Sequence, residues 1–141
     1  MTKKSTAGRL VLAITAIISA SQVWRVILLL LVIVVGFLAL IPAQPKSMDL
    51  GWDKLNHMAA FATLTGVGYL GFPAALRHRF FIFFGLFAYG CAIEICQLLV
   101  PGRSCEWGDL LADSVGIACG AFIAGCLTRG LPKHLRTSDR H

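Results

Sequence analysis

Long apolar runs separated by short polar segments dominate the chain. A helix needs about 20 residues to cross the hydrocarbon core of a bilayer. The runs that reach this length without a dense set of charges are residues 23–41, 55–76, 80–100 and 109–127. Because lipid offers no hydrogen bonds to the backbone, such runs must be helical. The pattern predicts an all-α membrane protein with four transmembrane helices in a bundle.

A shorter apolar stretch at residues 10–20 precedes the first predicted span. With Lys3 and Lys4 before it and small residues at its end, it is similar to a secretory signal peptide. However, cleavage there would leave the first span without most of its basic anchor. We therefore expect an interfacial or re-entrant N-terminal segment within residues 1–22, with a cleaved signal peptide as the alternative.

Composition supports a location in lipid. Charged residues make up 14% of the 141 residues, against about 25% in soluble domains. The net charge is +6, but the basic residues lie at the ends of apolar runs, where they meet anionic lipid headgroups. We expect membrane lipids as partners and no nucleic acid.

The distribution of Lys and Arg predicts the orientation. Basic residues collect in the N-terminus, at residues 77–79 and in the tail 129–141, whereas the other two loops carry balanced charges. The positive-inside rule then places both termini and a turn at 77–79 in the cytoplasm. The prediction is a multi-pass bacterial inner-membrane protein with one four-helix domain at residues 23–128.

Small residues and cysteines within the runs have structural interpretations. We expect close helix packing at Gly66, Gly68 and Gly71 in the second span. In the fourth span, small residues recur every four positions, at Gly116, Gly120 and Ala124. The five cysteines show no metal-binding spacing, and the four within apolar runs are expected to be small buried hydrophobic residues.

Polar side chains within the predicted spans gather near the outer face. Asp53 and His57 are four residues apart, as are Asp109 and Asp113, and each pair shares a helix face. An ionisable group deep in a membrane costs about 2.5–3.5 kcal/mol, so such groups mark functional sites. The predicted pocket has Glu94, His57 and Asp113 as catalytic candidates, and Asp53, Lys54, Gln97, Arg103 and Asp109 as binding residues.

These residue types suit acid–base chemistry or recognition. A carboxyl such as Glu94 or Asp113 is a candidate general acid or base, and His57 a candidate proton shuttle. Arg103 and Lys54 are expected to hold a phosphate or carboxylate. Gln97 offers a neutral hydrogen bond. The hypothesis is an enzyme acting on a lipid-linked cell-envelope substrate.

Other functions remain open on the sequence. The same pocket suits a non-catalytic envelope accessory protein or a lipid or glycopeptide binder, and an interhelical polar clamp would be purely structural. A metal site at Asp53, His57, Glu94, Asp109 and Asp113 lacks the Glu-x-x-His pairing of carboxylate-rich bundles, so no metal or other cofactor is expected. Transport needs polar groups near the inner face, which a single chain lacks. Transport by an oligomer of the chain remains an alternative.

Three motifs give the chain a resemblance to the VanZ-like family. They are D-K-L-N-H-M-A-A-F at 53–61, E-I-C-Q-L-L-V-P-G-R at 94–103 and D-L-L-A-D-S-V-G at 109–116. The resemblance implies a multi-span protein connected to the cell envelope; the family's namesake is associated with resistance to the antibiotic teicoplanin. Asp113 departs from the pattern, because the family commonly has Asn there.

Overall fold

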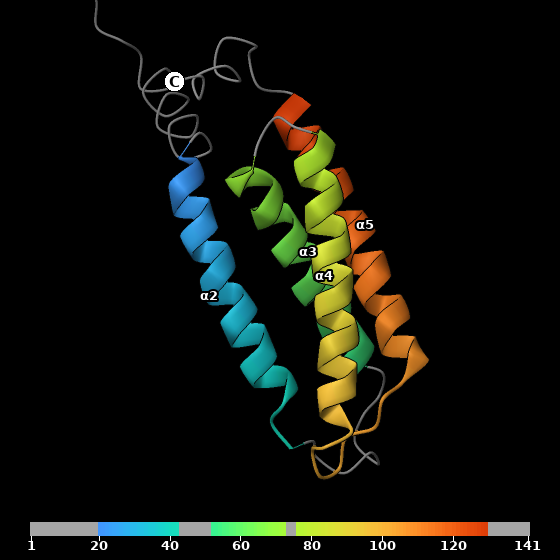
Figure 1. Ribbon diagram of the computed structural model, residues 1–141. Coiled ribbons are helices and arrows are strands. Elements are labelled where there is room, and N and C mark those ends of the chain that lie inside the picture. Colours follow the sequence, from blue (N-terminus) through green and yellow to red (C-terminus); the bar gives the residue numbers. More distant parts are fainter. Residues whose placement is uncertain (1–19, 43–51, 73–75, 130–141) are drawn as a thin grey trace, which may run out of the picture.

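The computed structural model describes residues 20–42, 52–72 and 76–129, and these form a bundle of helices that alternate in direction (Figure 1). No β-strand occurs in these ranges, so the predicted all-α architecture is confirmed. Residues 1–19 of the predicted N-terminal segment and residues 130–141 of the predicted cytoplasmic tail lie outside the described residues. The helices are α2 (Ser21–Ala39), α3 (Trp52–Gly71), α4 (Leu76–Gln97) and α5 (Trp107–Arg129).

Helices α2, α4 and α5 are long and apolar enough to cross a membrane. The apolar side chains of α2 point largely away from the bundle, and none of its residues is buried. Helix α3 has a similar length but a lower mean hydropathy, because its first two turns contain Asp53, Lys54, Asn56 and His57. Helix α3 belongs to the bundle because it packs against α2, α4 and α5, although its own composition is less apolar than theirs.

Helix α3 packs most extensively against α5, and glycine makes this contact possible. A Cβ atom on Gly116 would lie 2.3 Å from the carbonyl oxygen of Met58, and one on Gly120 would lie 2.3 Å from that of Ala62. The spacing predicted for the fourth span is therefore confirmed as helix packing. Gly66 is different, because a Cβ atom there would meet nothing within 4 Å.

The turn between α3 and α4 lies earlier than predicted. Residues 77–79 form part of the first turns of α4, which begins at Leu76, and α3 ends at Gly71. Pro73 explains the shift, because proline disfavours helical backbone in the residue before it, here Phe72. The predicted turn at 77–79 and the predicted end of the second span at residue 76 are therefore wrong.

Other helix ends also differ from the ends of the predicted spans. Helix α4 stops at Gln97, and Leu98 to Val100 form a hydrogen-bonded turn that leads to Gly102, whose φ is 79°. This turn is apolar, which is why the sequence pattern extended the third span to residue 100. Helices α3 and α5 begin slightly before their predicted spans, so Asp53 and Asp109 both lie in a first helical turn rather than at an N-cap.

The cysteines do not fill the core as expected. Cys96, Cys119 and Cys126 are exposed on the outer surface of the bundle, and Cys91 is half-buried. The core instead consists of larger side chains, since burying these removes more apolar surface. Its buried residues are Phe61, Leu64, Leu86, Ile93 and Ile117.

Candidate functional site

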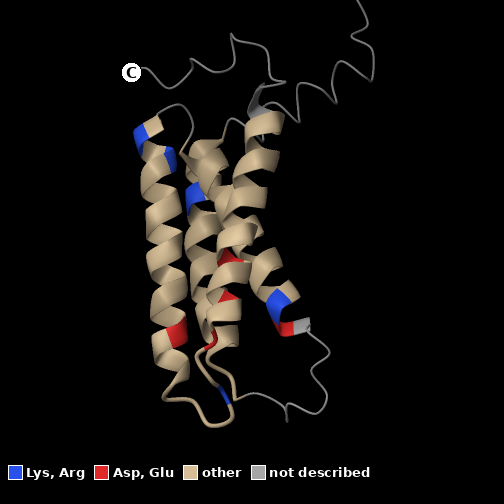
Figure 2. Ribbon diagram, turned by 90° about the vertical axis from the view of Figure 1, so that its right-hand side faces the viewer, with Lys and Arg blue, Asp and Glu red and all other residues tan. Residues whose placement is uncertain are grey.

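The described acidic residues all lie in one half of the bundle, which we call the polar end (Figure 2). Here α2 and α4 finish, α3 and α5 begin, and the segment 98–106 joins α4 to α5. All eight residues predicted for the site lie at this end. They come from α3, α4, α5 and the segment 98–106: Asp53, Lys54, His57, Glu94, Gln97, Arg103, Asp109 and Asp113.

The two cationic side chains of the predicted site are both engaged with protein carboxylates. Arg103 Nη1 lies 3.3 Å from Asp53 Oδ1 and 3.4 Å from Asp53 Oδ2. Lys54 Nζ lies 3.1 Å from Glu106 Oε2 and 3.3 Å from Asp109 Oδ1. A phosphate would have to compete with these carboxylates.

His57 and Asp113 form a buried pair across α3 and α5. His57 Nδ1 lies 2.9 Å from Asp113 Oδ1, and the side chains are 9% and 1% exposed. The second oxygen of Asp113 has no hydrogen-bond partner and faces Gly90 of α4, where a Cβ atom would lie 2.6 Å from it. Because the space at Gly90 is open, Asp113 fits between three helices beside His57.

Glu94 is the one carboxylate on α4, and it is buried, at 1% exposure. Its Oε2 accepts a hydrogen bond of 3.0 Å from the backbone N–H of Glu106, and its Oε1 has no partner. Glu106 also binds Lys54, and its carbonyl accepts from the N–H of Asp109. Sequence reasoning missed Glu106, because it looked like a loop charge that balances Arg103.

Helix α2 contributes backbone acceptors and an apolar wall to this site. Gln97 Nε2 donates to the carbonyl of Ala39 at 3.0 Å, and Arg103 Nε donates to that of Ile41 at 3.3 Å. Ala39 is the last residue of α2 and Ile41 lies just beyond it, so no later turn of the helix supplies donors to these carbonyls. Sequence reasoning could not find them, because a carbonyl acceptor has no side-chain signature.

A cavity of about 460 Å³ opens between α2, α3 and α4 beside these residues. One part of its wall is polar and the other is apolar. The polar part consists of Asp53, Asn56, His57 and Arg103. The apolar part consists of Val35, Leu38, Ala39, Ala60, Phe61 and Ile93. Such a cavity suits a molecule that has both a polar group and a hydrocarbon part.

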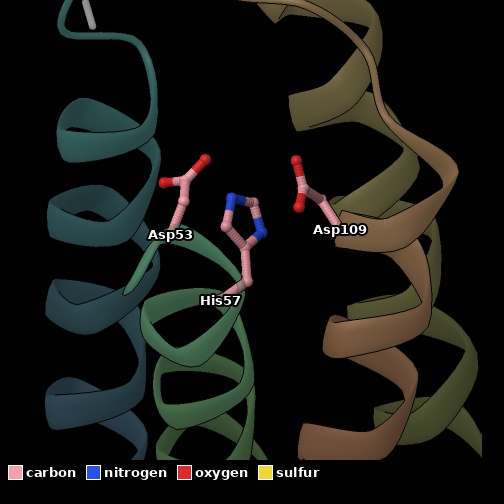
Figure 3. Close-up of side chains that lie close together, drawn as sticks. All are labelled: Asp53, His57 and Asp109. Carbon is pink, nitrogen blue, oxygen red and sulfur yellow. The ribbon is translucent and has the colours of Figure 1, made fainter. Parts of the chain in front are cut away.

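Three residues of the polar end are arranged so that they could hold a metal ion. Asp53 and His57 from α3 and Asp109 from α5 point toward one another (Figure 3). One potential ligand atom of each lies within 4.8 Å of the others. Glu94 and Asp113, which the sequence also placed in a candidate metal set, lie outside this trio.

Comparison with known proteins identifies a family that the chain matches. The model of a family described as VanZ/LLP1 matches residues 9–128, which include the described parts of α2, α3 and α4, nearly all of α5, and the whole polar end. No curated protein and no solved structure matches the chain. The family therefore agrees with the resemblance that the three motifs indicate.

Proposed function

The chain belongs to the VanZ/LLP1 family, and on that premise we propose that it is a membrane protein whose polar end binds the headgroup of a lipid-linked cell-envelope compound. In this arrangement all four helices cross the bilayer, both termini are cytoplasmic and the polar end faces outward. The positive-inside distribution of Lys and Arg supports this orientation.

The observation that carries the proposal is the cavity wall, one part of which is polar and the other apolar. Asn56 and Arg103 supply hydrogen-bond donors and Asp53 supplies acceptors, while Phe61 and Ile93 continue the surface as apolar side chains. Because both cations are engaged with carboxylates, the site suits a hydroxyl-rich or amide-bearing headgroup better than a bare phosphate. The lipid chain would then lie along the apolar part.

Filling the cavity should remove the bound lipid. Ala60 on α3 lines the cavity, so Ala60→Leu adds bulk where the lipid would lie. We expect the purified variant to retain at least about tenfold less envelope lipid, a loss of about 1.4 kcal/mol in binding. Native mass spectrometry from native-lipid particles measures this directly.

Ala59→Leu is the matched control, because Ala59 is the neighbouring residue on α3 and is exposed. It adds the same bulk outside the cavity and should leave lipid retention unchanged. Equal retention by both variants would show that no lipid occupies the cavity. If neither variant nor the unchanged protein retains envelope lipid, the polar end is a structural clamp.

The proposed orientation is testable at Cys105, an exposed thiol in the segment between α4 and α5. Partial desolvation, followed by the charge of Glu94 nearby, raises the pKa of this thiol above its ordinary value. Since the thiolate is the reactive form, we expect a membrane-impermeant maleimide to label it from outside slowly near neutral pH. Below the pKa, the rate should rise about tenfold per pH unit.

Two variants control this measurement. Cys105→Ser should abolish the labelling, and Glu94→Gln should speed it, because one negative charge beside the thiol is removed. Labelling that requires access from the cytoplasmic side would invert the orientation. In that case the polar end would face inward and an outer-leaflet compound could not be its ligand.

Catalysis at the same site is a second candidate, favoured by the pair formed by His57 and Asp113. His57 lines the cavity, and the buried carboxylate holds one of its ring nitrogens. This leaves the other nitrogen available for proton transfer, with Glu94 as a further acid or base. Catalysis requires a released product, whereas binding alone leaves the lipid chemically unchanged.

A further inference from the structure

We propose that Asp53, His57 and Asp109 bind a divalent transition-metal cation, of the class that includes Zn²⁺ and Mn²⁺. This goes beyond the proposed lipid-binding function, which does not require a metal. It also differs from the acid–base candidate, because a metal ion on His57 would take the nitrogen that proton transfer needs.

The geometry of the three side chains is close to that of a metal site. Their candidate ligand atoms lie within 4.8 Å of one another. Tetrahedral bonds of about 2.0–2.2 Å from zinc to nitrogen and oxygen place two ligand atoms about 3.3–3.6 Å apart. The three side chains would therefore have to close by up to about 1.5 Å, a shift within reach of side-chain rotation, and all three lie in the first two turns of helices that face one another (Figure 3).

The hydrogen bond with Asp113 orients His57 for metal binding. Its Oδ1 lies 2.9 Å from His57 Nδ1, so the carboxylate holds the tautomer that has a proton on Nδ1. The lone pair is then on Nε2, the nitrogen that remains available to a metal. Metal-binding histidines commonly have such a carboxylate on their other ring nitrogen, where it fixes the orientation of the ring.

The charge balance of the polar end points independently to a bound cation. The described part of this end has five carboxylates, and its lysine and arginine side chains, Lys54 and Arg103, pair with three of them. The carboxylates belong to Asp53, Glu94, Glu106, Asp109 and Asp113.

Two of these carboxylates are almost fully buried. Glu94 and Asp113 are each 1% exposed, and each has one oxygen without a hydrogen-bond partner. Glu94 also binds the N–H of Glu106, whose carbonyl accepts from Asp109, so its charge lies close to the trio. The unpartnered oxygen of Asp113 faces Gly90 rather than the trio, so these two carboxylates contribute their charge, and a divalent cation would offset this excess of negative charge.

The ligand types restrict the ion. Imidazole nitrogen is uncommon around Mg²⁺ and Ca²⁺, which prefer oxygen, but it suits Zn²⁺ and other transition metals. Three protein ligands leave at least one coordination position for water or a substrate group. Because Asp53 and His57 line the cavity, that open position would face its contents.

Metal titration of the full-length protein tests the proposal. The protein is purified in detergent, stripped with a chelator and titrated with Co²⁺, whose visible absorption reports coordination; Zn²⁺ retention is measured by elemental analysis after desalting. We expect stoichiometric binding. His57→Gln and Asp109→Asn should each weaken it by about 100-fold, the upper end of the loss seen when only the support of a metal ligand is altered, since each removes a direct ligand. His78→Gln, a histidine change near the start of α4, should bind as the unchanged protein does.

Two further measurements test the site even if a ligand variant fails to fold: metal binding by Asp113→Asn, and the thermal stability of the unchanged protein with Zn²⁺. Asp113→Asn should keep the Co²⁺ absorption but weaken binding by about tenfold, the loss expected when the support of a metal ligand is altered. Zn²⁺ should raise the thermal midpoint of the unchanged protein by mass action. Failure of that protein to retain Zn²⁺, or equal affinity in His57→Gln, would overturn the site. Lipid retention that survives chelation would leave the lipid proposal intact.

Discussion

Replacing Gly116 by alanine is expected to destabilise the bundle, although the same change in an ordinary helix stabilises by about 1 kcal/mol. The added Cβ atom would lie 2.3 Å from the carbonyl oxygen of Met58 and 3.1 Å from the backbone nitrogen of Ala62. Backbone atoms cannot rotate away as a side chain can, so α3 and α5 must separate. We expect a loss of about 1–3 kcal/mol in the free energy of unfolding.

Gly125→Ala on the same helix is the matched control, because a Cβ atom there would meet nothing within 4 Å. It should be neutral or slightly stabilising. The thermal midpoints of both variants, measured by size-exclusion chromatography after heating in detergent, give the comparison. Equal midpoints for the two variants would mean that α3 and α5 are not in close contact at Gly116.

Replacing Asp113 by alanine is expected to disable the site as well as destabilise it. The change removes the acceptor of the His57 hydrogen bond and leaves a gap beside Gly90. An unpaired buried donor costs about 1–3 kcal/mol. His57 would also lose its fixed orientation, so we expect the retained envelope lipid, measured by native mass spectrometry, to fall at least about tenfold.

Asp113→Asn separates the hydrogen bond from the charge. Asparagine has an oxygen that can still accept from His57, and the VanZ-like pattern commonly has asparagine at this position. We expect lipid retention close to that of the unchanged protein. If Asp113→Ala lowers the thermal midpoint but leaves lipid retention unchanged, the pair of His57 and Asp113 only holds α3 and α5 together.

The sequence predicted the gathering of the site because helix geometry fixes depth. Once the apolar runs are counted as helices, Glu94 lies about two turns before the end of its run. Asp113 lies at a comparable distance from the start of the next run. The bundle does bring these carboxylates, with His57, to one end, where His57 pairs with Asp113 and Glu94 accepts from the N–H of Glu106. The periodicity and length of the apolar runs were therefore sufficient to predict that these residues gather at one end of the bundle.

Pairing within the site was beyond the sequence, because it depends on the path of the segment between α4 and α5. Arg103 was expected to bind a substrate group, yet it reaches back to Asp53 and the end of α2. Glu106 turns its side chain toward Lys54 and its N–H toward Glu94. Charge patterns indicate which residues are available, whereas loop geometry decides which of them meet.

Helix boundaries were limited by the same kind of information. Apolar residues at 98–100 continue the hydrophobic pattern, but they form a turn. Conversely, the basic residues at 77–79 look like a turn, but they begin a helix. Hydropathy measures transfer into lipid rather than backbone conformation, so proline and glycine were the better markers of where each helix ends.

The hydrogen bonds from Gln97 and Arg103 to the end of α2 bear on how this protein can diverge over time. Both side chains recognise main-chain carbonyls, which every amino acid supplies. Tyr89 does the same at Val32. Purifying selection should therefore act on the donors in α4 and the following segment, while the lipid-facing positions of α2 drift among apolar residues. Homologues with unrelated first helices could still build the same site.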